Sequence, residues 1–159
     1  MIDEVYIETP LGIATISGDK DGIASVSVTK ESDNLPSKDI PLHLQKAVSQ
    51  LKEYFEGQRI DFELTLNPSG TDFQKKVWAE LLKIPFGKTV SYLDIAKRLG
   101  DPKTIRAAAS ANGKNPLWII VPCHRVIGSD GSLTGYAGGL WRKKWLLDHE
   151  SPVKQQSLF

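Results

Sequence analysis

The chain has 159 residues, 40% of them hydrophobic, with a formal net charge of +1 and a single cysteine. These values favour one or two small globular domains. A single cysteine excludes an internal disulfide and a zinc site built on several thiolates. No run approaches about 18 consecutive apolar residues, which excludes a membrane-spanning helix. Because the acidic segment MIDEVYIETP lacks the basic region and apolar core of a signal peptide, we expect a cytoplasmic protein that does not contact membranes.

The first 70 residues predict a small antiparallel sheet with one helix. Apolar and polar residues alternate, with turn signals between the segments, at residues 4–9, 12–17 and 23–29. The segment LHLQKAVSQLKEYFEG has apolar residues at helical spacing and ends at Gly57, so it predicts a helix. Alternation in IDFELTL, residues 60–66, predicts a further strand.

A change in charge marks a boundary near residue 70, within the turn signal NPSGT. Residues 1–70 contain 6 Lys and Arg against 12 Asp and Glu, whereas residues 71–159 contain 14 against 7. The basic second half favours a surface that faces a polyanion such as nucleic acid. The alternative is that both halves are ordinary solvated surfaces.

The second half predicts mainly helices. Thr71, Ser91 and Asp101 are expected N-caps of three successive helices, and the last of these ends at Asn112 and Gly113. The second and third are short and joined by a tight turn, which makes them a helix-turn-helix candidate. The apolar run at residues 117–121 predicts a buried strand, and a glycine-rich loop and an amphipathic helix follow at residues 128–139 and 140–150.

Cys123 is the candidate nucleophile. A thiolate is strongly nucleophilic, but a nearby base must take its proton, and two histidines qualify. His124 is adjacent to Cys123 but needs a sharp turn or a bridging water to reach it, whereas His149 could be oriented by its neighbour Glu150. The alternative is that Cys123 only fills the core.

The helix segment RAAASANG has one long side chain, Arg106, on a surface of small residues. A B-DNA minor groove is about 6 Å wide, so a helix that enters it needs small side chains, and a single arginine could then reach the base stack. The alternative is close packing of the alanines against another helix.

The motif PCHRV, followed by GYAGG and WLLDHE and preceded by PFGKTVSY and GKNP, resembles the O6-alkylguanine–DNA alkyltransferases. The resemblance runs from about Phe73 to Glu150. It implies an α/β (α+β) fold: a small N-terminal antiparallel sheet-plus-helix domain at residues 1–70, a mainly helical C-terminal domain with a helix-turn-helix at 71–151, and a flexible tail at 152–159.

The resemblance also implies a reaction and its residues. Cys123 would take the alkyl group from O6-alkylguanine in double-stranded DNA in a single turnover, without cofactor or metal. The implied catalytic residues are Cys123, His124, Glu150, Asn115 and Tyr92. The implied DNA-binding residues are Arg106, which would replace the extruded base, with Tyr92, Ala107, Ala108, Ser110 and Ala111. The implied substrate pocket comprises Tyr136, Val126, Ala137, Pro122 and Asn112.

Three further expectations concern partners and alternatives. We expect a monomer. The C-terminal residues from Gln155 to Phe159, QQSLF, resemble peptides that dock on a DNA polymerase sliding clamp, although they could also simply fray. Two other functions stay open: a DNA-binding module without chemistry, and a thiol hydrolase that uses Cys123, His124 and Glu150.

Overall fold

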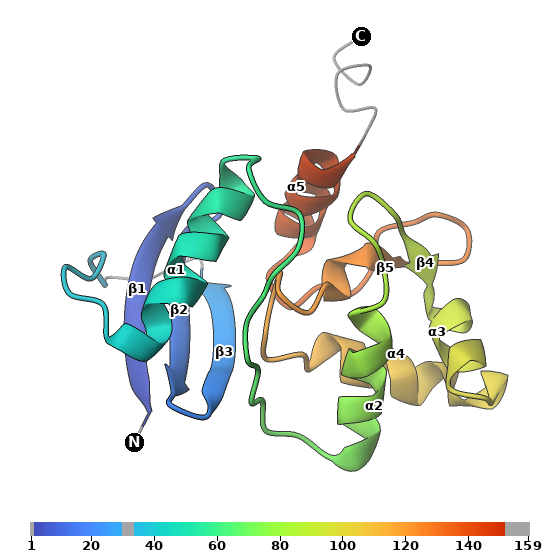
Figure 1. The fold of residues 1–159 in the computed structure, drawn as a ribbon. Coiled ribbons are helices and arrows are strands. Elements are labelled where there is room, and N and C mark those ends of the chain that lie inside the picture. The colour runs from blue at the N-terminus through green and yellow to red at the C-terminus, as the bar shows by residue number, and fades with distance from the viewer. Residues whose placement is uncertain (1, 30–33, 152–159) are drawn as a thin grey trace, which may run out of the picture. The chain divides into compact units, whose positions relative to one another are not determined.

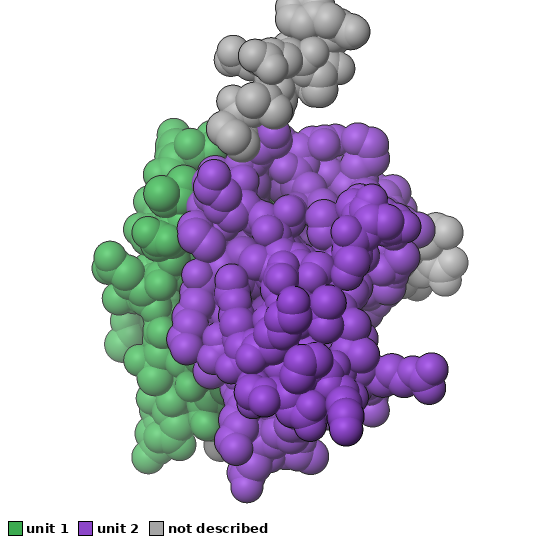
Figure 2. All heavy atoms as spheres, turned by 90° about the vertical axis from the view of Figure 1, so that its right-hand side faces the viewer, with its two compact units in different colours: residues 1–69 green, residues 70–159 purple. Residues whose placement is uncertain are grey.

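The computed structural model describes residues 2–29 and 34–151 (Figure 1). The chain divides into two compact units, residues 1–69 and residues 70–159 (Figure 2). The QQSLF segment lies outside the described residues. No helix in the described part of the chain combines the length and apolar character needed to cross a membrane.

The first unit is a three-stranded antiparallel sheet covered by a helix (Figure 1). Strands β1 (Asp3–Thr9), β2 (Gly12–Asp19) and β3 (Gly22–Thr29) pair in sequence order, as their alternation predicted. Helix α1 (Leu42–Phe55) packs its apolar side on the sheet. The core between them contains Val5, Ile7, Ala14, Ile16, Val26, Leu44, Ala47 and Leu51.

The predicted strand at residues 60–66 is wrong. Only Leu66 forms a bridge, a parallel one with Ile23 at the start of β3. Earlier in the segment the backbone of Glu63 bonds to a side chain instead: its N–H donates to Gln50 Oε1 at 2.9 Å, and its carbonyl accepts from Gln50 Nε2 at 3.3 Å. The segment is therefore extended and alternately half-buried, but a glutamine on α1 supplies the partners that a neighbouring strand would.

The second unit is mainly helical. It contains α2 (Asp72–Leu81), α3 (Tyr92–Arg98), α4 (Ile105–Gly113) and α5 (Leu140–Glu150), with a short parallel pair of strands, β4 (Val90–Ser91) and β5 (Val126–Ile127). Thr71 and Ser91 form complete capping boxes on α2 and α3. Asp101 accepts from the backbone of Lys103 at the 3₁₀ turn Pro102–Thr104, which leads into α4.

The alanine-rich helix α4 packs closely on α2 through its buried side. Ala108 and Ala111 are only 1% and 3% exposed, and the indole Nε1 of Trp78 on α2 donates to the Ala111 carbonyl at 2.9 Å. Small side chains permit this close approach. The side chains of Ala108 and Ala111 therefore face the core, and contact of these residues with DNA stays a prediction.

We expect Gln50→Leu to lower the free energy of unfolding by about 2 kcal/mol, because a net hydrogen bond contributes about 1 kcal/mol and two are lost. Urea denaturation would measure the change. The matched control is Gln45→Leu on the same helix, where the exposed amide donates one bond to the Ile40 carbonyl. Equal losses in the two variants would show that Gln50 does not anchor the Glu63 segment.

Candidate active site

The chain reaches Cys123 through a series of tight turns. The buried strand predicted at residues 117–121 is wrong: these residues are mostly buried, but Val121 N–H donates to the Leu117 carbonyl at 2.9 Å, and Cys123 N–H to the Val121 carbonyl at 2.8 Å. Ile119 has a φ of 74°. A branched residue in this left-handed region is strained, so surrounding contacts must hold the turn in place.

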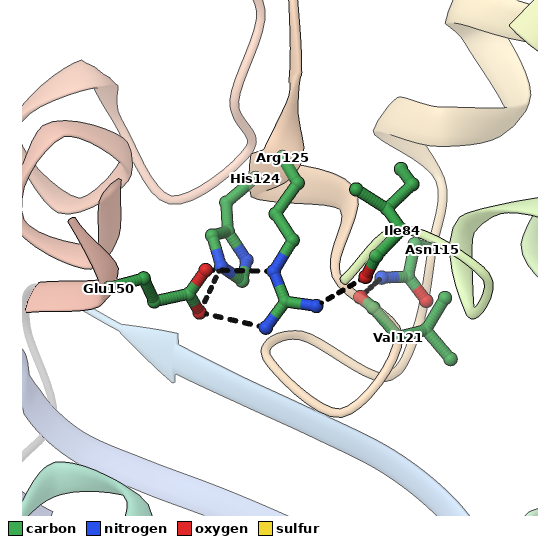
Figure 3. Close-up of polar contacts among 6 residues, drawn as sticks. All are labelled: Ile84, Asn115, Val121, His124, Arg125 and Glu150. Atoms are coloured by element: carbon green, nitrogen blue, oxygen red, sulfur yellow. Dashed lines mark hydrogen bonds and ion pairs between the residues drawn. The ribbon is translucent and has the colours of Figure 1, made fainter. Parts of the chain in front are cut away.

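Asn115 provides those contacts. Its Oδ1 accepts from Leu117 N–H at 2.9 Å, while its Nδ2 donates to the Val121 carbonyl at 2.8 Å (Figure 3) and to the Leu117 carbonyl at 3.3 Å. The side chain is buried, so these bonds do not compete with water. A single amide thus closes the turn that delivers the cysteine, as an asparagine can do by imitating backbone groups.

Cys123 begins a 3₁₀ turn, Cys123–Arg125, rather than ending a strand. The thiol is free and its residue is 4% exposed. Burial raises the pKa of Cys123 to about 11, although a hydrogen bond from Asn115 and the charge of Lys143 oppose the rise. Because burial disfavours the thiolate, a base must take the proton as the sulfur reacts.

His124 has one ring nitrogen bound and the other available. Its Nε2 lies 2.8 Å from Glu150 Oε2, and both side chains are buried (Figure 3). Burial lowers the pKa of His124, against the opposing effect of Glu150, so the ring is neutral near pH 7. An ionised carboxylate only accepts, hence Nε2 carries the hydrogen. Nδ1, which has no partner among the described residues, then presents its lone pair.

Arg125 holds the carboxylate that orients His124. Its Nε donates to Glu150 Oε1 at 2.7 Å and its Nη2 to Oε2 at 3.0 Å, while Nη1 donates to the Ile84 carbonyl at 2.7 Å (Figure 3). Burial alone would raise the pKa of Glu150, but His124 and Arg125 outweigh it and lower the pKa to about 2. Arg125 is not among the residues predicted for the site, although its place beside His124 was a signal.

His149 stacks on another ring of α5. Its ring stacks on Trp145 with centroids 4.9 Å apart, whereas the Glu150 carboxylate faces His124 and Arg125. The two neighbours on α5 point in different directions because successive helical positions are about 100° apart. Of the two candidate bases, His124 is the one whose ring nitrogen lies 2.8 Å from the Glu150 carboxylate.

A pocket of about 630 Å³ lies between the exposed side of α4 and the glycine-rich loop. Five predicted residues line it together: Tyr92, Arg106, Ser110, Tyr136 and Ala137. Its lining also includes Thr134 and four residues that were not predicted, namely Ile105, Ala109, Gly113 and Gly135. Helical spacing was the available signal for Ile105, Ala109 and Gly113, since each lies four residues from the next and positions four apart share a face.

The other predicted pocket and DNA-binding residues lie elsewhere. Ala107 is exposed but does not line the pocket. Pro122 and Val126 are buried at the two ends of the turn at residues 122–126, which we call the active-site turn. Asn112 is buried at the end of α4, where its Nδ2 lies 3.4 Å from the Cys123 carbonyl and its Oδ1 has no partner among the described residues. This amide connects the end of α4 to the nucleophile.

Metal-ligating side chains do not cluster in the described ranges: no group of three or more His, Cys, Asp or Glu side chains is placed to hold a metal ion.

Two family models match the chain. Residues 72–152 match the DNA-binding domain of 6-O-methylguanine DNA methyltransferase, and residues 2–68 match the ribonuclease-like domain of the same family. The methylated-DNA–protein-cysteine methyltransferase of Methanosarcina acetivorans is 44% identical over 147 residues, which cover 90% of this chain and 94% of the relative. The protein of that name from Mycobacterium tuberculosis H37Rv is 44% identical over 154 residues, covering 94% and 93%.

Solved structures agree with these matches. The crystal structure of Mycobacterium tuberculosis O6-methylguanine methyltransferase superposes with a TM-score of 0.84 at 39% identity and covers 100% of both chains. The crystal structure of Mycobacterium tuberculosis OGT in complex with DNA has a TM-score of 0.83 at 44% identity and covers 92% of both chains.

We expect Glu150→Gln to destabilise the fold by about 3–5 kcal/mol at pH 7, because it leaves Arg125 buried without its anion. The pKa of Glu150 is lowered on folding, so its contribution is complete above about pH 4.5 and is lost as the pH falls towards about 2. The difference in free energy of unfolding between wild type and Glu150→Gln should therefore become smaller as the pH falls from about 4.5 towards about 2. Chemical denaturation at several pH values would measure this difference.

The matched control is Asp148→Asn, which removes a carboxylate from an exposed pair with Lys144 on the same helix. An exposed pair contributes less than about 1 kcal/mol. If Glu150→Gln lowers the free energy of unfolding by as little as Asp148→Asn does, or by an amount that does not depend on pH, the assigned role of the buried carboxylate is contradicted.

Proposed function

This chain belongs to the 6-O-methylguanine DNA methyltransferase family, and from that premise we propose how its own residues repair alkylated DNA. The reaction is the irreversible transfer of an alkyl group from O6-alkylguanine in DNA to Cys123. One observation carries the assignment to these residues: a buried thiol follows an asparagine-closed turn and precedes a histidine whose free nitrogen is set by a buried carboxylate.

The transfer forms one bond and breaks one. The Cys123 sulfur attacks the alkyl carbon, the S–C bond forms, and the bond from that carbon to guanine O6 breaks with its electron pair left on the base. The thiol proton passes to His124 Nδ1, through a water where the two do not touch, and the base regains a proton to become ordinary guanine. The thioether has no further leaving group, so each molecule reacts once and needs no cofactor.

The buried pair of Arg125 and Glu150 prepares His124 for this proton. Arg125 holds both carboxylate oxygens, so Glu150 stays ionised and keeps the hydrogen of His124 on Nε2. When Nδ1 takes the thiol proton, the resulting imidazolium lies 2.8 Å from that carboxylate. The carboxylate stabilises the positive charge that develops on His124. This attraction offsets the free-energy cost of burying the charged ring and the charged carboxylate.

The pocket residues would hold the alkylated base and protonate the guanine as it leaves. The Tyr92 hydroxyl lines the pocket and donates to the Thr134 carbonyl at 3.1 Å, a position from which it can turn to protonate the leaving guanine. Tyr136 and Ala137 would form the wall beside the adduct. The Val126 carbonyl accepts from Lys143 Nζ at 2.7 Å and keeps a second lone pair for the guanine amine.

DNA is the partner of the α3–α4 region, and Arg106 is the residue that would occupy the gap left by the extruded base. Its side chain is exposed at the pocket rim, and beyond it the exposed side of α4 carries small residues, Ala107, Ala109, Ser110 and Gly113. Extrusion costs a few kcal/mol, which an arginine inserted into the stack can partly offset. We propose that the chain acts on duplex DNA as a monomer.

We expect Cys123 to gain the mass of one methyl group when the chain is incubated with duplex DNA that carries O6-methylguanine, with no more than one equivalent of guanine restored. Intact-mass spectrometry and peptide mapping would measure this. Cys123→Ser should bind the same DNA without transfer. Repeated turnover by the wild type, or transfer to another residue, would contradict the mechanism.

We expect Arg106→Ala to slow single-turnover repair of duplex DNA by roughly 10- to 100-fold, since each 1.4 kcal/mol of lost compensation is a factor of ten. Reaction with free O6-benzylguanine should change by less than about twofold, because a free base needs no extrusion. The control Lys114→Ala removes an exposed cation after α4 and should leave the rate at saturating DNA unchanged. Equal losses on both substrates would assign Arg106 to the chemistry or the fold.

A further inference from the structure

Two buried side-chain atoms near the nucleophile, Asn112 Oδ1 and His124 Nδ1, have no hydrogen-bond partner in the part of the chain that the structure describes. Their residues are 4% and 0% exposed. Both atoms are acceptors, because His124 carries its hydrogen on Nε2, which faces Glu150 (Figure 3). A buried acceptor without a partner costs free energy, so such an atom usually marks a bound water or a functional group.

The backbone of the nucleophile fixes the orientation of the Asn112 amide. Its Nδ2 donates to the Cys123 carbonyl, with the two atoms 3.4 Å apart. If the amide were turned over, its oxygen would face the carbonyl oxygen and the two would repel. Residue 112 therefore presents an acceptor, and not an amino group, on the side of the amide that has no protein partner.

The Asn112 amide, the thiol and the imidazole are grouped around one peptide bond. The Cys123 carbonyl that binds Asn112 belongs to the peptide that joins Cys123 to His124, although Asn112 comes from α4 and the other two residues from the active-site turn. A buried water makes about three hydrogen bonds to polar groups in such a place. The thiol hydrogen, His124 Nδ1 and Asn112 Oδ1 supply one donor and two acceptors, which is a complete set for one water.

We propose that Asn112 is a positioning residue that orients the water between the Cys123 thiol and His124. The water donates one hydrogen to His124 Nδ1 and the other to Asn112 Oδ1, so only its lone pairs remain for the thiol. The S–H group must then donate to the water, which is the direction in which the proton has to travel. This inference rests on the proposed function, in which a water carries the thiol proton to His124.

The proton transfer leaves the contact with Asn112 unchanged. As the thiol proton reaches the water, the hydrogen that the water shares with Nδ1 moves to the imidazole, so the water is neutral before and after the step. Its new hydrogen then points back to the sulfur, which is now a thiolate, and its other hydrogen stays on Oδ1. Asn112 therefore needs no rearrangement during the reaction, which is the condition for efficient preorganisation.

Without the Asn112 oxygen, the same water has a second hydrogen with no fixed acceptor. That hydrogen can point to the thiol sulfur, which is a weak acceptor, and the thiol hydrogen then points away from the water. A water in this orientation cannot accept the thiol proton until it rotates. The Asn112 carbonyl group thus excludes an unproductive arrangement of the water.

Two substitutions at residue 112 separate the acceptor oxygen from the rest of the side chain. Asn112→Leu keeps the shape and removes both polar atoms, whereas Asn112→Asp loses only the donor to the Cys123 carbonyl and keeps an acceptor. Loss of the bond to the Cys123 carbonyl is therefore common to both variants. Lys114→Ala, at an exposed residue just beyond α4, is the control. Asn112→Met, which also lacks both polar atoms, replaces the leucine variant if circular dichroism shows that the latter is unfolded.

The measurement is the limiting rate of the single-turnover reaction with free O6-benzylguanine at neutral pH, in light and in heavy water. A free base leaves DNA binding out of the comparison. We expect Asn112→Leu to react roughly tenfold more slowly than the wild type, with a larger ratio of the rates in light and heavy water, because proton transfer then limits the reaction more. Asn112→Asp should keep at least about a third of the wild-type rate, and Lys114→Ala should be unchanged.

Equal slowing in Asn112→Leu and Asn112→Asp would assign Asn112 to the bond with the Cys123 carbonyl alone and would overturn the proposal. An unchanged rate in Asn112→Leu, or an unchanged ratio between light and heavy water, would overturn it as well. A wild type that transfers no alkyl group would instead contradict the proposed function, whereas differences among variants of an active wild type test only the role of Asn112.

Discussion

The second unit is organised around the buried carboxylate of Glu150, which Arg125 and His124 share. Arg125 contributes two hydrogen bonds to the carboxylate and a third to the Ile84 carbonyl, just beyond α2. The end of α5, the active-site turn and the end of α2 therefore meet at one ion pair. Its removal would leave a buried charge without a partner, so the same contact that stabilises the fold also fixes which nitrogen of His124 is free.

The reactive groups and helix α4 are connected through backbone carbonyls. Asn115 closes the turn before Cys123, and Asn112, at the end of α4, places its amide near the Cys123 carbonyl. A nucleophile held in this way needs little reorganisation when a base enters the pocket. Preorganisation of this kind is an efficient source of rate enhancement, because the positioning is complete before the substrate arrives.

The positive charge of the second unit has two uses. Arg125, Arg142 and Lys143 are buried and donate to a carboxylate or to backbone carbonyls, so these three charges are not available to DNA. Arg106 and Lys114 are exposed on or beside α4. The excess of Lys and Arg in the sequence predicts a surface that faces a polyanion, and the structure shows that part of this charge stabilises the interior instead.

The sequence by itself determined the features that depend on local chemistry: the alternating strands β1–β3, the helices and their Thr71 and Ser91 caps, and, through the PCHRV motif, the family. Only the tertiary structure decided the rest. The extended segment at residues 60–66 is held by hydrogen bonds to the Gln50 side chain, and the apolar run at 117–121 is folded into turns by Asn115. Ala108 and Ala111 face the core, and the Glu150 carboxylate bonds to His124. In each of these cases the partner is distant in the chain or is a side chain acting on backbone, so periodicity and composition carry no signal of it.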